Sequence, residues 1–197
     1  MELTRDYKVG DQTGTARLLA FRTHAVLARY ADALAQALAS GTTPDINQVR
    51  TNEHSTWGVG IGVDHKLRSD VNLFARAMYA DGKTETDAFT EADRSLSAGV
   101  AVRGARWSRP DDTFGLAVAS GFLSGAHRKY LAKGGTTFFL GDGALNYHPE
   151  RVFEAYYSFA IATGTFATLD VQRITNPGYN ADRGPVCVYG VRLHWER

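Results

Sequence analysis

Hydrophobic and polar residues alternate with a period of two along much of this chain. From Ser55 to Leu67, large hydrophobic residues fall on odd positions, from Trp57 to Val63, and glycine or aspartate falls on the even positions between them. Successive side chains of a β-strand point to opposite faces, so this pattern predicts a strand. The run 71–79 repeats the pattern after the three residues 68–70, which predicts a β-hairpin.

The same alternation recurs along the rest of the chain and predicts eight strands in all. Their approximate ranges are 14–25, 55–67, 71–79, 93–106, 114–119, 153–161, 167–172 and 189–195, of which the first is the least regular.

The links between these strands alternate between short and long. Short turns fall near 68–70, 107–112 and 163–165, and long links span roughly 26–53, 81–92, 123–149 and 175–184. Short turns at one end and long loops at the other are typical of outer-membrane barrels. The sequence therefore predicts an all-β, antiparallel, up-and-down transmembrane β-barrel. Two helical stretches, 26–39 and 125–133, are interpreted as parts of external or inward-folded loops.

Alternation by itself does not say which face meets water. In a soluble barrel the apolar side chains point inward, whereas in a porin they point outward around a wet lumen. Large aromatic residues on the apolar face lie mainly near strand ends, where the interfacial girdles of a membrane barrel lie. They are Trp57, Tyr79, Phe114, Phe153 and Trp195. The opposite face carries small residues and isolated charges, which favours a pore lining. A soluble β-barrel that binds a small apolar ligand in its interior remains the alternative.

Composition and charge exclude several classes of protein. The formal net charge of +1 offers no basic excess for nucleic acid, so no nucleic-acid partner is expected. The single cysteine, Cys187, excludes an internal disulfide. No stretch approaches the roughly 20 apolar residues of a membrane helix. The first residues, MELTRDYK, have no apolar segment of the kind that a signal peptide needs.

Candidate catalytic and ligand-binding motifs are weak. Gly58, Gly60 and Gly62 resemble a dinucleotide-binding loop only loosely, because they alternate within a strand with no following helix. The six histidines are scattered without the spacing of metal ligands. No nucleophile elbow accompanies the serines. We therefore expect no enzyme activity, no cofactor and no metal site.

Several short segments together resemble the carbohydrate-selective porin family of Gram-negative outer membranes. In the C-terminal part they are GDGALNYHPE at 141–150, EAYY at 154–157, LDVQ at 169–172, NPGYNADRGP at 176–185 and GVRLH at 190–194. Upstream they are LFAR at 73–76, DG at 81–82, DRSLS at 93–97 and GARWSRPDD at 104–112. The order and spacing of the C-terminal segments resemble those of the family's C-terminal region, and the likeness covers most of the chain.

The resemblance implies a sixteen-stranded barrel in the outer membrane, of which residues 1–197 would be the C-terminal half, a single partial barrel domain. On this interpretation the signal peptide belongs to the other half. The chain departs from the family by closing on Trp195-Glu196-Arg197, where such barrels commonly finish on Phe. Eight strands closed on themselves would leave an interior just wide enough for side chains. The implied function is passive diffusion of mono- or oligosaccharides. The implied partners are these sugars and membrane lipid, and the sequence leaves open whether the barrel is a monomer or a homo-oligomer.

A sugar channel needs a wet constriction where hydroxyl groups exchange hydrogen bonds with polar side chains. The candidate lining residues all fall on the polar face of their strands. They are Arg76, Arg103, Glu154, Tyr156, Asp170, Gln172 and Arg192. For each, a structural ion pair or hydrogen bond in the wall is an equal alternative. His127, Arg128 and Lys129 would narrow the mouth if their loop folds inward; a solvated helix face is the other interpretation.

Overall fold

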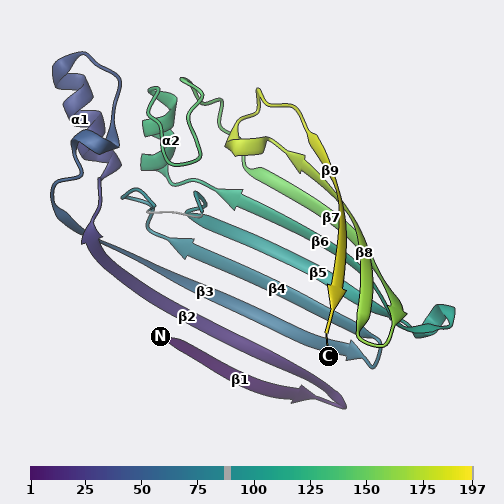
Figure 1. Cartoon of the computed structure of the whole chain (residues 1–197). Helices are drawn as coiled ribbons and strands as arrows, with labels where there is room; N and C mark the ends of the chain where they lie inside the picture. Colours follow the sequence, from purple (N-terminus) through teal and green to yellow (C-terminus); the bar gives the residue numbers. More distant parts are fainter. Residues whose placement is uncertain (87–89, 197) are drawn as a thin grey trace.

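The computed structural model describes residues 1–86 and 90–196, and these form one antiparallel sheet with two short helices at one end (Figure 1). The sheet has nine strands in the order β1 to β9, each paired with its neighbours in the chain. The strands are β1 (Glu2–Val9), β2 (Gln12–Val26), β3 (Glu53–Arg68), β4 (Val71–Ala80), β5 (Arg94–Gly104), β6 (Arg109–Phe122), β7 (Glu150–Ala162), β8 (Thr165–Thr175) and β9 (Val186–Trp195).

Short turns and long links alternate along the whole sheet, as the sequence predicts. The turns 10–11, 69–70, 105–108 and 163–164 lie at one end of the strands, and the links 27–52, 81–93, 123–149 and 176–185 lie at the other. In Figure 1 the long links gather above the upper ends of the strands. The link 81–93 contains residues 87–89, which lie outside the described residues, so only part of the predicted link 81–92 is described.

The helices lie in the long links where they were expected, with small changes in their bounds. Helix α1 (Tyr30–Ser40) begins four residues after the predicted start, because β2 continues through Val26. It ends at Gly41, whose φ of 68° is left-handed and allows its N–H to bond back to Ala37 O. Helix α2 (Gly125–Ala132) begins at Ser124, whose side chain accepts a hydrogen bond from His127 N.

The sheet has one more strand than the eight that the alternation predicts. The additional strand, β1, pairs with β2 from Glu2↔Leu19 to Val9↔Gln12. Its pattern is hard to recognise because Arg5 interrupts the hydrophobic series Leu3, Tyr7 and Val9 on one face. Charged residues on the other face are ordinary for a strand whose second face is polar, so they do not argue against a strand.

The register divides the strand residues between two faces. Residues directly opposite each other in an antiparallel pair share a face, and the register is continuous from β2 to β9 except for irregularities near the short-turn ends of three pairs. We call the face that carries Val59 and Ile61 the outer face, and the face that carries Gly60 and Gly62 the inner face. Every second residue along each strand belongs to one face.

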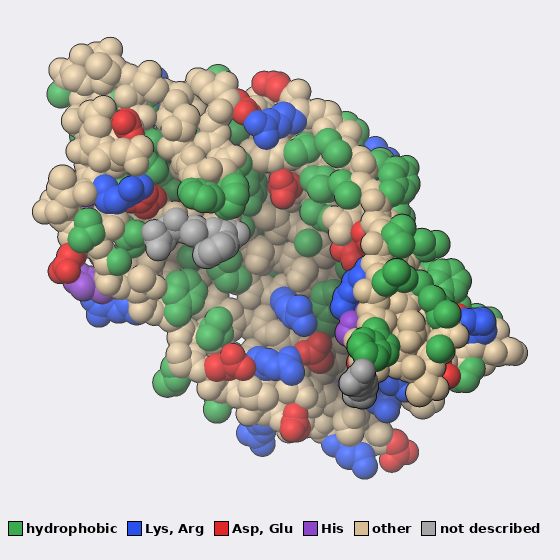
Figure 2. All heavy atoms as spheres, in the orientation of Figure 1, with side chains coloured by type: hydrophobic (Ala, Val, Ile, Leu, Met, Phe, Trp, Pro, Cys, Tyr) green, Lys and Arg blue, Asp and Glu red, His purple; other side chains and the backbone are tan. Residues whose placement is uncertain are grey.

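Large hydrophobic side chains of the outer face are exposed. They include Ile61 at 54%, Leu96 at 55% and Val191 at 77% exposed. Across β7 and β8, inner-face residues are the more shielded, as expected on the concave side of a curved sheet. Figure 2 looks into that concave side, where acidic and basic side chains lie in the hollow and hydrophobic side chains crowd the outer edge. This is the inverted arrangement of a porin rather than that of a soluble barrel.

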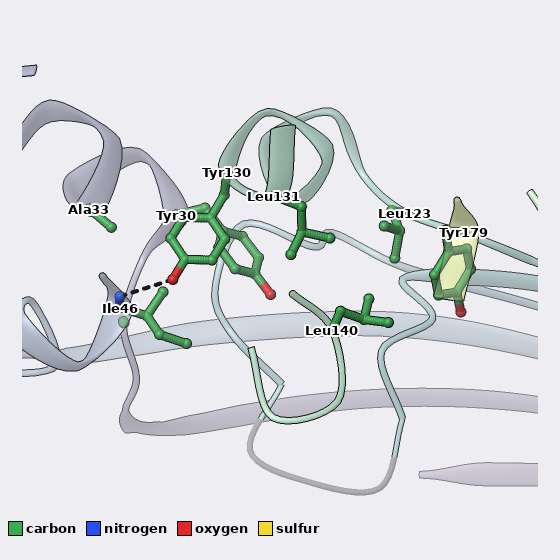
Figure 3. Close-up of a cluster of buried hydrophobic side chains, with 9 residues drawn as sticks. Tyr30, Ala33, Ile46, Leu123, Tyr130, Leu131, Leu140 and Tyr179 are labelled. Atoms are coloured by element: carbon green, nitrogen blue, oxygen red, sulfur yellow. Dashed lines mark hydrogen bonds between the residues drawn. The ribbon is translucent and has the colours of Figure 1, made fainter. Parts of the chain in front are cut away.

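The buried hydrophobic cluster lies outside the sheet, among the long links. We call this cluster, formed by the links 27–52, 123–149 and 176–185, the cap. Its buried hydrophobic residues are Ala28, Tyr30, Ala33, Ile46, Leu123, Tyr130, Leu131, Leu140 and Tyr179 (Figure 3). Tyr130 joins two links, since its hydroxyl accepts from Ile46 N and donates to Thr136 O at 2.8 Å. Within the described chain, no hydrophobic strand residue reaches this degree of burial.

Buried polar side chains connect the cap to the link 81–93. The ring of His127 is fully buried; its Nδ1 lies 3.1 Å from an oxygen of Asp93, and its Nε2 lies 3.6 Å from an oxygen of Glu91. Its ring stacks on Tyr30 with centroids 4.5 Å apart. Glu85, which is also buried, forms an ion pair with Arg50 and accepts from Ala28 N at 2.7 Å. Such burial of carboxylates is stable because each has hydrogen-bond donors.

The described part of the sheet is open, with β1 and β9 as its edges. In an up-and-down sheet of nine strands, both edge strands run in the same direction. A wholly antiparallel barrel could therefore close around it only with an odd number of additional strands whose edge strands run the opposite way. A second copy of the same nine strands in the same orientation would meet it in parallel. No helix among residues 1–86 and 90–196 is long and apolar enough to span a membrane.

Candidate functional site

The inner face of β7, β8 and β9 forms a polar hollow of about 590 Å³. Five of the seven predicted lining residues border it, because the register places them on neighbouring positions of one face: Glu154, Tyr156, Asp170, Gln172 and Arg192. Glu154 lies opposite Gln172, and Tyr156 lies opposite Asp170. Carboxylates, an amide, a phenol and a guanidinium thus meet within a few residues of one another.

Hydrogen bonds hold part of this wall in place. Gln172 Nε2 donates to Glu154 Oε2 at 3.2 Å, which orients both side chains across β7 and β8. Thr168 Oγ1 donates to Ser158 Oγ at 3.1 Å on the same face. Arg192, opposite Thr168, has no carboxylate partner within the part of the chain that the structure describes. Glu154 and Gln172 thus form a hydrogen bond within the sheet of the kind that the structural alternative describes.

A glycine gives one feature of this hollow its shape. The ring of Tyr156 lies against Gly115 on β6, where a Cβ atom would approach it to 2.1 Å. Asp170 faces Gly190 on β9, where a Cβ atom would make ordinary contact with its carboxylate. Gly115 therefore makes room for an aromatic ring on the neighbouring strand.

Arg103 borders a neighbouring hollow nearer the short-turn end. This hollow measures about 660 Å³ and shares Asp111, Thr113 and Phe166 with the first one. The two hollows are therefore continuous along the inner face, and Arg103 stands on the side of the short turns.

Arg76 lies on a different part of the inner face. Its guanidinium is 3.9 Å from Asp64 and 5.1 Å from the centre of the Phe74 ring. Arg17 on β2 forms a second ion pair with Asp64. The structure therefore separates Arg76 from the other candidates and places it in a cluster of two cations around one carboxylate.

Sequence reasoning missed several polar residues of these clusters. Arg17 was overlooked because its strand alternates poorly; Leu19 and Phe21 share its face. Ser158 and Thr168 were not selected, although each stands two positions from a selected residue and so has the same face. Extending the period of two from Tyr156 and Asp170 would have found both.

The cap covers the long-link end of the inner face. Tyr179 packs over Gly121, where a Cβ atom would lie 2.9 Å from its hydroxyl oxygen, and Gly178 N donates to the carboxylate of Glu150 at 2.8 Å. Burial raises the pKa of Tyr179. His127 does not line the mouth, since its side chain is fully buried in the cap. Arg128 and Lys129 are exposed, and the Arg128 guanidinium lies 4.6 Å from the centre of the Tyr147 ring.

Across residues 1–86 and 90–196, no three histidine, cysteine or carboxylate side chains are grouped so as to hold a metal ion. Cys187 is an exposed free thiol on β9.

Comparison with known proteins gives the family. A family model described as "Carbohydrate-selective porin, OprB family" matches residues 1–196. The chain belongs to this porin family. Its members are porins of the outer membrane. No curated protein matches the chain significantly.

A solved structure supports the porin fold. The structure titled "High pH structure of Pseudomonas putida OprB" is similar to this chain with a TM-score of 0.78 and 20% sequence identity. The similarity covers 98% of this chain and 47% of that one, so the chain spans about half the length of the structure that it matches. An antiparallel porin sheet with few helices is thus confirmed as the fold class.

Proposed function

We propose that the inner face of this sheet lines part of an outer-membrane channel for passive, carbohydrate-selective diffusion of small sugars. The observation that carries the proposal is the convergence of Glu154, Tyr156, Asp170, Gln172 and Arg192 around one open hollow. On this proposal residues 1–197 are one part of a barrel wall that further strands complete.

The residue types suit a sugar better than an ion or an apolar solute. Sugar hydroxyl groups both donate and accept hydrogen bonds, and the hollow offers carboxylate acceptors, a guanidinium donor and an amide that does both. The Tyr156 ring adds an apolar surface against which a sugar ring can lie. Each hydrogen bond contributes only about 0.5–1.5 kcal/mol after exchange with water. Binding of this strength lets a sugar enter and leave, as a channel requires.

Liposome swelling with the complete protein tests this function. We expect permeation of monosaccharides to exceed that of an uncharged solute of equal size without hydroxyl groups. Asp170→Ala should reduce the difference several-fold, because it removes a hydrogen-bond acceptor that only the sugar uses. Leu169→Ala, which changes the outer face of the same strand, serves as the matched control.

Equal rates for sugars and for the solute without hydroxyl groups would contradict carbohydrate selectivity. Loss of permeation by both solutes in the Asp170 variant would instead indicate that the wall had collapsed. Heat-modifiable migration on a detergent gel distinguishes a folded barrel from an unfolded one in every variant.

A further inference from the structure

Four arginines lie on the outer face of the sheet, near the long-link ends of four strands. The register places each opposite residues of the outer face: Arg22 opposite Trp57, Arg94 opposite Tyr79 and Phe122, Arg151 opposite Ser120, and Arg173 opposite Phe153. All four are exposed. We call them the outer arginine belt. None of them belongs to the inner-face hollow of the proposed channel.

The belt arginines form no ion pair with a carboxylate of the described residues. Arg22 donates to Ser55 Oγ at 3.1 Å, and the Arg94 guanidinium lies 4.7 Å from the centre of the Tyr79 ring. Among the described residues, none of the four arginines forms an ion pair. Glu53, at the same edge of this face, lies 3.3 Å from His24 instead. The belt therefore has a net positive charge.

The opposite end of the sheet shows the contrast. There Arg106 Nε lies 2.5 Å from Asp70, and Arg109 Nε lies 2.5 Å from Asp112. Arg106 and Arg109 thus have carboxylate partners, whereas among the described residues the four arginines of the belt form no ion pair.

An apolar groove adjoins the belt. It has a volume of about 810 Å³ and is lined mainly by outer-face side chains, among them Ile61, Leu96 and Phe122. Arg94 and Arg128 line the same groove. Arg128 comes from α2 in the cap, so one cation of the sheet and one cation of the cap border a single apolar surface. The groove suits a molecule that has both an acyl chain and an anionic group.

The position of the belt determines which leaflet of the membrane lies beside it. Long loops of outer-membrane barrels are extracellular, so the belt lies at the level of the outer leaflet. An arginine facing lipid is costly at the middle of a bilayer and nearly neutral at its edge, where the side chain can extend towards the headgroups. Guanidinium groups bind phosphate with two parallel hydrogen bonds, which makes phosphate the fitting partner.

We propose that the outer arginine belt and its groove bind a phosphorylated glycolipid of the outer leaflet, with phosphate groups on the arginines and acyl chains on the apolar surface. A soluble anion would use the arginines but not the groove. A zwitterionic lipid would use the groove without a net charge to match the belt. The proposal rests on the location of the family in the outer membrane and does not depend on transport of sugars.

Native mass spectrometry of the complete protein in detergent tests the proposal. The probes are diphosphoryl lipid A, monophosphoryl lipid A and phosphatidylcholine. We expect retention to fall in that order. Because one basic residue near an anionic surface changes the affinity by about fivefold, replacing all four belt arginines with glutamine should weaken diphosphoryl lipid A binding by roughly several hundredfold. Replacement with lysine should restore much of it.

A second comparison keeps the test decisive if the fourfold variant folds poorly. The single variants Arg151→Gln and Arg173→Gln should each weaken binding by about fivefold, while Arg5→Gln, on the outer face of β1, should leave it unchanged. Equal retention of phosphatidylcholine and lipid A, or glutamine variants that bind as the parent does, would overturn the proposal. Sugar permeation in the same variants should stay unchanged, which separates this test from that of the channel.

Discussion

Hydrophobic side chains are exposed on the outer face of the strands and buried in the cap. On the outer face of the strands, Ile61 and Val191 are largely exposed, whereas Tyr30 and Tyr130 in the cap are fully buried. The strands are held by backbone pairing along eight strand pairs, and the cap is held by packing between links that are distant in sequence.

The difference follows from the solvent that each region meets. In the proposed channel, membrane lipid covers the outer face, so exposure of its hydrophobic side chains in the isolated chain is the state that suits a bilayer. On the same proposal the cap stands in water, where apolar side chains are stable only against each other. One chain therefore contains a wall of membrane type and a small core of water-soluble type.

The largest expected effect is in the cap. Tyr130→Ala removes a fully buried ring and both hydrogen bonds of its hydroxyl, to Ile46 and Thr136. Such a change costs about 3–5 kcal/mol. Hydrogen exchange should show faster opening of α1 and α2 with the strand amides unchanged.

The matched control is Leu38→Ala on α1, where the side chain is 87% exposed to the same solvent. Its effect should remain within about 0.5 kcal/mol. If Tyr130→Ala accelerates exchange in β3 to β8 as much as in the helices, the cap and the wall form one cooperative unit and the contrast between them fails.

A smaller effect separates the two faces of one strand. Val171 is on the outer face of β8 and Gln172, its neighbour, is on the inner face beside Glu154. Val171→Arg places a cation against lipid and should lower the free energy of unfolding by about 2–4 kcal/mol. Gln172→Arg gains a carboxylate neighbour and should change it by less than about 1 kcal/mol. Urea unfolding of the complete protein from phosphatidylcholine vesicles measures both.

Equal destabilisation by the two substitutions would mean that both faces of β8 meet the same medium. The reverse order would place lipid on the face that we call inner.

The smallest effect concerns the pH dependence of the cap. Hydrogen bonding from Asn180, with the nearby Arg183 guanidinium, holds the pKa of Asp142 below its usual value. A carboxyl group whose pKa is lower in the folded state stabilises that state above its unfolded pKa of about 4, and the contribution is lost as pH falls through the folded value. Asp142→Asn should remove this contribution and cost less than about 1 kcal/mol at neutral pH.

Hydrogen exchange in the links 123–149 and 176–185, followed from pH 7 to below pH 4, checks this expectation. The parent should lose protection as pH falls, and Asp142→Asn should lose less. Identical profiles would show that Asp142 does not couple the two links.

Much of the wall was predictable because its periodicity is local. Trp57 to Val63 alternate within a single strand, and the residues Glu154, Tyr156, Asp170 and Gln172 could be assigned to one face without knowledge of their neighbours. The cap was not predictable in this way. Tyr30, Tyr130 and Tyr179 come from three links, and no period in the sequence connects them. His127 is an example: the sequence made it a candidate for the pore mouth, but the structure buries it in the cap.

The sequence by itself determined eight of the nine described strands, the alternation of short and long links, and the face of each predicted lining residue, because a strand has a period of two at every position. Only the tertiary structure decided which of those residues meet. Register and sheet curvature bring five of the seven to one hollow and leave Arg76 with Arg17 and Asp64. They also leave a row of arginines on the outer face that form no ion pair with the described residues, because pairing depends on distances between strands that no single strand encodes.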